Sequence, residues 1–180
     1  MKYIYTLLVL IFIYVVGNDI YKQYSKSGAM SHRIACHKTY KTFERTYDKA
    51  LLKKAQKQVL SGEYNLTSCI KEAKYMQTKM FKYVELENVN QMVRDEIKKR
   101  EVSRSKSDGQ LHIDYYIYEN DKADPGKKTK KSKLYAGFLR FILDFNGKEF
   151  YSVQTDFMSL EGTDIPQSVE CAIESFITAS

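Results

Sequence analysis

The sequence predicts an α+β fold with N-terminal helices, then a three-stranded antiparallel meander, then a C-terminal helix. Three observations predict it. Apolar residues in the first half of the folded part recur every three or four positions, as on one face of a helix. In the last third they alternate, as on one face of a strand. After Pro166 the helical spacing returns. Helices that are grouped apart from strands are typical of the α+β class.

The first helical pattern covers residues 31–60, a stretch without Gly or Pro. Ser61 and Gly62 supply its C-terminal stop, and Thr67 or Ser68 offers an N-cap for the next helix. We therefore expect a long amphipathic helix here. Its apolar stripe consists of Cys36, Tyr40, Phe43, Tyr47, Ala50 and Leu51.

A second helical pattern follows up to Ile97 and loses phase at residues 85–90. Either two helices or one kinked helix would explain this break. The polar run 98–110 ends the helical half, with Asp108-Gly109 as its turn. The apolar positions are Ile70, Ala73, Met76, Met80, Tyr83, Val84, Val89, Met92, Val93 and Ile97.

Three runs in the last third predict strands at residues 111–118, 134–145 and 148–158. Asn146-Gly147 joins the second and third, and this dipeptide suits the positive φ angles of a type I′ hairpin turn. The run 134–145 is apolar on both faces, so we expect it at the centre of the meander.

The hairpin register and the outer strand faces indicate where a partner could bind. A two-residue loop would place Leu143 opposite Phe150 and Ile142 opposite Tyr151. The outer faces and strand edges are then the expected interface, although the same residues could pack under a helix. The candidate interface residues are Tyr116, Tyr118, Tyr151 and Phe157.

Pro166 opens the last helix, because proline is favoured in the first helical turn. Its apolar positions follow the spacing of a single helix face. A cystatin-like or NTF2-like arrangement is compatible with this order of elements, although no residue motif identifies a family. The apolar positions are Val169, Ala172, Ile173, Phe176 and Ile177.

Residues 3–16 form a charge-free apolar run near the N-terminus. As a helix this run would span about 21 Å, short of the ~30 Å hydrocarbon core and typical of a signal peptide. We therefore interpret residues 1–17 as a signal peptide or N-terminal membrane anchor, 18–30 as a tether and 31–180 as a single extracytoplasmic domain, periplasmic or secreted. Cleavage, retention as an inner-membrane anchor, and a domain that faces the cytoplasm all stay open.

The three cysteines suggest one disulfide and one free thiol in an exported domain. We predict the pair Cys69–Cys171, which would tie the last helix to the helical half. Three free thiols and a pair that includes Cys36 are the alternatives. A continuous first helix would place Cys36 roughly 36 Å from the helix end near Leu60, while Cys69 lies just beyond the turn that follows. A Cys36–Cys69 bond is therefore excluded unless that helix breaks.

The formal net charge of +7 is unevenly distributed, because no basic residue follows Lys148. The segment 122–133 is rich in lysine and predicts a solvated loop, and a second basic cluster lies at residues 98–106. Neither cluster has interleaved aromatic residues, so nucleic-acid binding is not indicated. The candidate contacts to an anionic surface are Lys127, Lys128, Lys130, Lys131 and Lys133.

The sequence holds no recognisable catalytic signature. It lacks a Gly-rich phosphate loop, a nucleophile elbow and an HExxH motif. On a helix, His32 and His37 would lie about 140° apart, too far around to share a metal with Cys36. We therefore predict no catalytic residue, no metal and no cofactor.

The first functional hypothesis is an exported or membrane-anchored, non-enzymatic protein-binding module of the cell envelope, such as an assembly factor or a toxin-neutralising protein. Its partner would be another protein, with membrane contact through residues 3–16 if they are retained. The alternative is an extracytoplasmic binder of polyanions or membrane surfaces that acts through its Lys-rich clusters. A small enzyme of unrecognised type is the third hypothesis.

Overall fold

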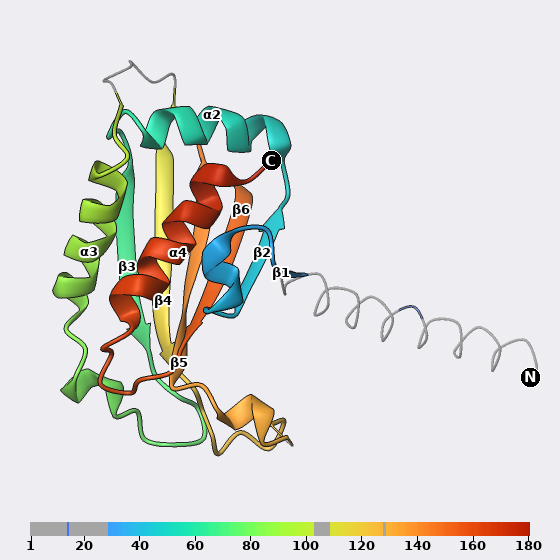
Figure 1. Ribbon diagram of the computed structural model, residues 1–180, viewed down its shortest axis with the longest axis vertical. Helices are drawn as coiled ribbons and strands as arrows, with labels where there is room; N and C mark the ends of the chain where they lie inside the picture. The colour runs from blue at the N-terminus through green and yellow to red at the C-terminus, as the bar shows by residue number, and fades with distance from the viewer. Residues whose placement is uncertain (1–13, 15–28, 103–108, 128) are drawn as a thin grey trace, which may run out of the picture.

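The computed structural model describes Tyr14 and residues 29–102, 109–127 and 129–180. Within these residues a six-stranded mixed sheet carries three α-helices on one face (Figure 1). The strand order is β1-β2-β6-β5-β4-β3, and every neighbouring pair is antiparallel except β3 and β4. The strands are β1 (Ala29–Ser31), β2 (Thr42–Thr46), β3 (Asn65–Lys71), β4 (Leu111–Glu119), β5 (Gly137–Phe145) and β6 (Lys148–Phe157). The helices are α2 (Lys49–Val59), α3 (Leu86–Lys98) and α4 (Ile165–Thr178), and the 3₁₀ turns are η1 (Ala35–Lys38), η2 (Met80–Lys82) and η3 (Lys131–Lys133).

The α+β class is confirmed, but the arrangement within it differs from the prediction. β4, β5 and β6 are antiparallel neighbours, yet they form the middle of a six-stranded sheet rather than a separate meander. The other three strands come from the N-terminal half, where helices were expected. The sheet is therefore twice as wide as the sequence pattern indicated.

The long helix predicted over residues 31–60 is wrong. The chain forms η1, then β2, and only then α2. The segment 42–46 begins and ends with threonine, and β-branched residues favour extended backbone. Asp48 then begins α2, because its Oδ1 accepts hydrogen bonds from the backbone N–H groups of Ala50 and Leu51. The apolar stripe that suggested one helix spans three separate elements.

The second predicted helix is correct only in its last part, α3. Residues 65–71 form β3 instead, with side chains that alternate between exposed and half-buried. The predicted cap at Thr67 or Ser68 is therefore wrong, since both lie within the strand. The break in phase that the sequence shows at residues 85–90 coincides with the true start of α3.

The Asn146-Gly147 turn is as predicted, but the strand register beyond it is not. Asn146 and Gly147 have φ angles of 52° and 80°. A β-bulge follows, so that Leu143 pairs with Tyr151 rather than with Phe150. Because side chains alternate along a strand, this shift of one residue turns the rest of β6 over to the opposite face.

The bulge places Tyr151 and Phe157 under the helices, where both are fully buried. Phe157 packs over Gly137, and a Cβ atom on that glycine would lie only 2.4 Å from the Phe157 ring. These two aromatic residues therefore belong to the core and not to the predicted interface.

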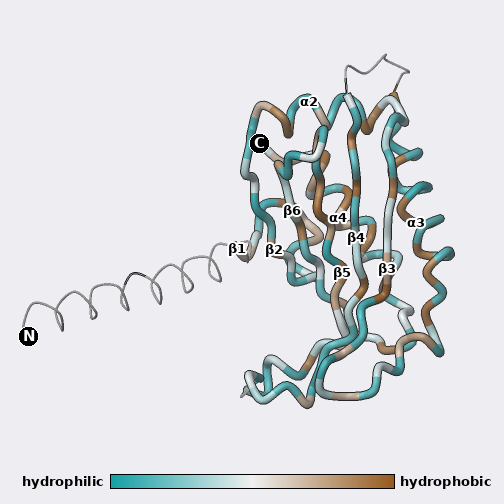
Figure 2. The backbone as a smooth tube through the Cα atoms, turned by 180° about the vertical axis from the view of Figure 1, so that it is seen from behind, coloured by the Kyte–Doolittle hydropathy of each residue, from teal (hydrophilic) through white to brown (hydrophobic). Residues whose placement is uncertain are grey.

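The core lies between the sheet and the helices. Tyr115 and Phe141 stack at its centre with ring centroids 4.9 Å apart. The last helix is confirmed as α4, with Pro166 in its first turn and its apolar stripe against the sheet. Figure 2 shows the opposite face of the sheet, which no helix of the described chain covers.

Candidate interaction surfaces

Cys36 and Cys171 form the disulfide, with Cα atoms 5.7 Å apart. The predicted pair Cys69–Cys171 is therefore wrong, and Cys69 is an exposed free thiol on β3. The prediction failed because η1 and β2, not a long helix, bring Cys36 to the side of α4. Cys171 is fully buried there rather than off the core. A disulfide is consistent with an extracytoplasmic location.

His37 lies beside this disulfide. Its Nε2 is 2.7 Å from the Ser175 hydroxyl, and its Nδ1 is buried without a hydrogen-bond partner in the described part of the chain. Candidate ligand atoms of Cys36, His37 and Cys171 all lie within 4.8 Å of one another. With the two sulfurs bonded to each other, no thiolate is free to bind a metal, so this cluster is a structural link.

Arg33 connects the start of the folded part to the end of α4. Its guanidinium donates to both carboxylate oxygens of Glu44, at 2.9 and 3.1 Å. It also donates to the backbone carbonyls of Ser175 and Thr178, at 2.7 and 2.8 Å. Because α4 has no basic residue in its last turn, Arg33 supplies the positive charge that a helix C-terminus favours.

Glu44 is the acceptor at the centre of this network. It accepts hydrogen bonds from Ser31 at 2.5 Å and from the Tyr151 hydroxyl at 2.6 Å, in addition to Arg33. Burial alone would raise the pKa of Glu44, but these hydrogen bonds outweigh it and hold the pKa below its usual value. Glu44 therefore stays charged in the folded protein.

We expect acid to destabilise the fold through two groups in turn. Burial lowers the pKa of His37, so the unfolded chain binds a proton more readily and stability falls as pH drops through about 6.5. The pKa of Glu44 is also lowered by folding. Its contribution to the stability of the fold is therefore complete above about pH 4.5 and is lost as the pH falls through the folded-state pKa.

Urea unfolding between about pH 7.5 and 3 measures both steps. His37→Asn should flatten the dependence on pH near 6, and Glu44→Gln should flatten it below about 4.5. If both variants keep the pH profile of the parent protein, other groups govern its acid sensitivity.

The open face of the sheet carries a cluster of half-buried aromatic residues. The rings of Tyr116 and Tyr118 lie 6.0 and 5.3 Å from that of Phe138 on the neighbouring strand. The Lys71 ammonium sits 3.5 Å above the centre of the Tyr116 ring, a cation–π contact. We call Tyr116, Tyr118 and Phe138 the aromatic cluster. Of the four predicted interface residues, Tyr116 and Tyr118 lie on this open face.

Polar and charged side chains surround the aromatic cluster. Lys41 lies over the rings of Phe43 and Tyr135, at 5.3 and 5.1 Å. Asp156 is 8 % exposed, and its burial raises the pKa of its carboxyl group. The face thus combines aromatic area with charges of both signs. The register of the strands places eight further residues on the same face as the aromatic cluster. They are Met30, Phe43, Arg45, Asp114, Arg140, Ile142, Ser152 and Gln154.

Two lysine-bearing loops meet at one end of the sheet, the lower end in Figure 1. Residues 72–85 connect β3 to α3, and residues 120–136 connect β4 to β5. We call this region the lysine end. The sequence identified the second loop through its composition, but nothing indicated that the first would lie beside it. Predicted contacts Lys130, Lys131 and Lys133 are exposed here, Lys127 is partly buried, and Lys128 lies outside the described residues.

Three consecutive residues at the end of β4, Glu119 to Asp121, hold both loops in place. Glu119 is buried and its Oε2 accepts from the backbone N–H groups of Lys79 and Met80, at 2.6 and 2.9 Å. Asp121 is 1 % exposed and accepts from the Tyr75 backbone N–H at 2.7 Å. These two carboxylates fix the first loop through its backbone.

Asn120 fixes the second loop. Its amide group donates to the carbonyls of Ser132 and Tyr135, at 3.1 and 2.8 Å. Its Oδ1 accepts a hydrogen bond from the Lys127 ammonium. The lysine end is therefore a built part of the fold. The sequence signal that could have indicated this region is the run of three hydrogen-bonding side chains, Glu119 to Asp121, where the alternating strand ends.

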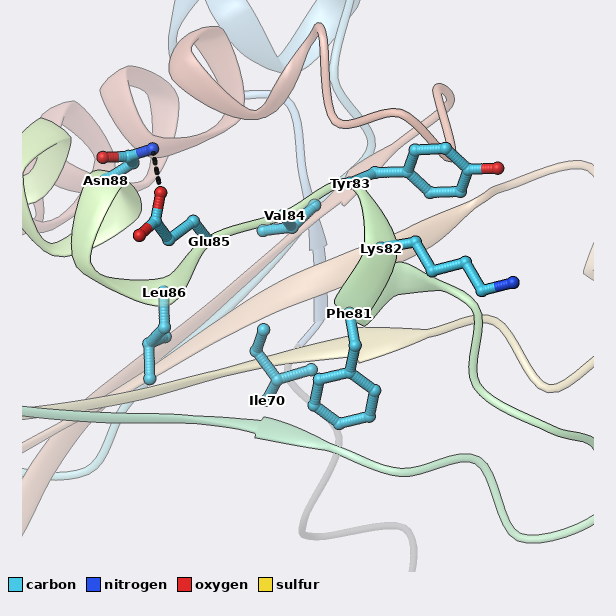
Figure 3. A pocket seen from close by; sticks show the side chains of 8 residues that line it. All are labelled: Ile70, Phe81, Lys82, Tyr83, Val84, Glu85, Leu86 and Asn88. Atoms are coloured by element: carbon cyan, nitrogen blue, oxygen red, sulfur yellow. Dashed lines mark hydrogen bonds between the residues drawn. The ribbon is translucent and has the colours of Figure 1, made fainter.

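A shallow pocket of about 620 Å³ opens between β3 and the segment that leads into α3. Figure 3 shows Ile70, Phe81 and Leu86 turned toward one another around it, while the Lys82 side chain extends away. Asn88 donates to Glu85 at its rim, at 3.0 Å. Its volume lies within the range of ligand pockets, but its lining offers apolar contact and no cluster of reactive groups.

The apolar run 3–16 lies outside the described residues, apart from Tyr14. Among the helices that the structure does describe, none has the length and apolar character needed to cross a bilayer. No protein-family model matches the chain, and comparison with curated proteins and with solved structures finds no match either.

Proposed function

We propose that this protein is a non-enzymatic protein-binding module of the cell envelope, exported or membrane-anchored through its N-terminal segment. The observation that carries the proposal is the open sheet face (Figure 2), on which the aromatic cluster lies. Aromatic residues are enriched at protein interfaces, where rigid rings supply large contact area at a small cost in conformational entropy.

The charges on this face suit a protein partner better than a small substrate. Lys71, Arg140 and Asp114 flank the aromatic cluster, so the cluster is an apolar centre bordered by charges of both signs. Interfaces commonly have such a centre and a polar rim. The disulfide supports the extracytoplasmic part of the proposal, because disulfides persist mainly in oxidising compartments.

Site-specific photo-crosslinking in the native envelope tests this function. A benzoylphenylalanine at Asp114 or Ile142, beside the aromatic cluster, should yield one discrete protein adduct. The same group at Lys53 on α2 or Glu170 on α4, both exposed on the helix side, should not. Equal adducts from both sides, or none from the sheet face, would contradict the proposal.

The aromatic cluster itself should determine this binding. Tyr116→Ala and Phe138→Ala should each weaken the adduct about tenfold, as expected when an interface aromatic is truncated. Tyr75→Ala is the matched control, because Tyr75 is exposed but lies at the lysine end. Circular dichroism of each variant shows whether the fold is kept.

A further inference from the structure

The lysine end combines positive charge with exposed apolar side chains. Its acidic residues do not neutralise it, because the lysines of this region outnumber its carboxylates, and two of those carboxylates, Glu119 and Asp121, are buried and bonded to backbone N–H groups. Glu72, Glu85 and Asp124 are the remaining carboxylates of the two loops. The exposed lysines are Lys74, Lys79, Lys82, Lys122, Lys130, Lys131 and Lys133.

The apolar side chains are concentrated in the same place. The described chain has nine large hydrophobic residues that are exposed, and five of them lie at this end. Phe81 and Tyr83 come from the first loop, and Leu134 comes from the second. Met158 joins them because β6 ends beside the start of β5. The five are Tyr75, Phe81, Tyr83, Leu134 and Met158, each between 48 % and 59 % exposed.

This combination fits the interface of a lipid bilayer. Lysines near an anionic membrane surface attract its headgroups, and each contributes to binding. Aromatic, leucine and methionine side chains enter the boundary between headgroups and acyl chains. A dissolved polyanion would contact the lysines but leave the apolar side chains in water. The two features together therefore favour a membrane over a free polyanion.

We propose that the lysine end docks on the surface of a bilayer that contains anionic phospholipids. Lys130, Lys131 and Lys133 contact headgroup phosphates, and Phe81, Tyr83 and Leu134 insert between them. The carboxylates of Glu119 and Asp121 hold the first loop in the shape that presents its side chains. This docking does not depend on the protein-binding role of the open sheet face.

Fluorescence quenching by brominated lipids tests the docking in the full chain. The sequence contains no tryptophan, so Phe81→Trp introduces a single tryptophan at the lysine end, whose emission can be excited apart from that of the tyrosines. Tyr47→Trp is the control reporter, because Tyr47 is 41 % exposed and lies next to α2, at the opposite end of the sheet in Figure 1. Both variants are added to vesicles of brominated phosphatidylcholine, with and without phosphatidylglycerol.

The expected result is a blue shift and the loss of most fluorescence from the Phe81→Trp variant in anionic vesicles, with little change in the control. Added salt of about 0.5 M should reverse this, because exposed charges are then screened. The quenching should also be abolished by a triple variant that combines Lys130→Gln, Lys131→Gln and Lys133→Gln. The matched triple variant Lys49→Gln, Lys53→Gln and Lys57→Gln removes the same charge from α2 and should leave it intact.

Three outcomes would overturn the proposal. Equal quenching in neutral vesicles would mean that residues 3–16 alone hold the chain at the membrane. Equal quenching of both reporters would mean that docking has no preferred end. Binding of polyphosphate without any quenching by vesicles would identify a dissolved polyanion as the ligand. None of these outcomes bears on the crosslinking test of the sheet face.

Discussion

Loss of the Cys36–Cys171 disulfide should lower the free energy of unfolding by about 2–5 kcal/mol. The bond closes a loop with a sequence separation of 135 residues. A crosslink over so long a loop removes much of the conformational entropy of the unfolded chain. Urea unfolding of the double variant Cys36→Ser and Cys171→Ser, and of the reduced parent protein, measures the effect.

Cys69→Ser is the matched control and should change stability by less than about 0.5 kcal/mol, because Cys69 is exposed and unbonded. Thiol counting gives an independent check. The native protein should label at one cysteine, and the denatured, reduced protein at all three. Labelling of two or more thiols in the native state would rule out the bond, and equal stability of the oxidised and reduced forms would contradict the predicted stabilisation.

The variant Glu119→Ala should lose about 3 kcal/mol of stability and release the first loop of the lysine end. It removes a buried acceptor that serves the N–H groups of Lys79 and Met80. Hydrogen bonds to a charged group contribute about 1.5–3 kcal/mol each, and a buried donor left without a partner adds to the loss. Hydrogen exchange should accelerate at these two amides, while urea unfolding measures the stability.

Glu72→Ala is the control for this prediction, because Glu72 is an exposed carboxylate in the same loop. Its effect should stay within about 0.5 kcal/mol. Glu119→Gln keeps one acceptor oxygen, so its loss of stability should lie between those of Glu119→Ala and Glu72→Ala. If the alanine variants at 119 and 72 behave alike, the buried carboxylate does not organise the loop.

The parts of the fold that the sequence predicted are those fixed by local chemistry. Asn146-Gly147 needs positive φ at both positions, and Pro166 suits only the start of a helix. The alternation in β4 is equally local, because each apolar residue faces the same core. None of these features depends on where the rest of the chain lies.

The N-terminal half was mispredicted because its pattern is ambiguous. Apolar residues at spacings of three and four suggested a helix across 31–60, yet threonine and tyrosine in residues 39–47 favour a strand. The seven residues of β3 also carry a period of two that a helical interpretation overlooks. Residues 42–46 become a strand by pairing with β6, and residues 65–71 become a strand by pairing with β4. Such long-range contacts leave no local signal in the sequence.

The candidate surfaces were only partly predictable for the same reason. Tyr116 and Tyr118 were identified because an alternating strand shows which side chains share a face. Tyr151 and Phe157 were misassigned because one bulged residue, Phe150, reverses the rest of β6. The first loop of the lysine end stayed hidden, since buried carboxylates at 119 and 121 bring it there.

The disulfide also determines how the protein responds to a cut in its backbone. Proteases cleave most readily at exposed loops, and the exposed lysines Lys130, Lys131 and Lys133 offer such a site. Every peptide bond between Cys36 and Cys171 lies inside the covalent ring that these two sulfurs close. A protein nicked there consists of two chains but migrates as one molecule, and it separates into fragments only after reduction.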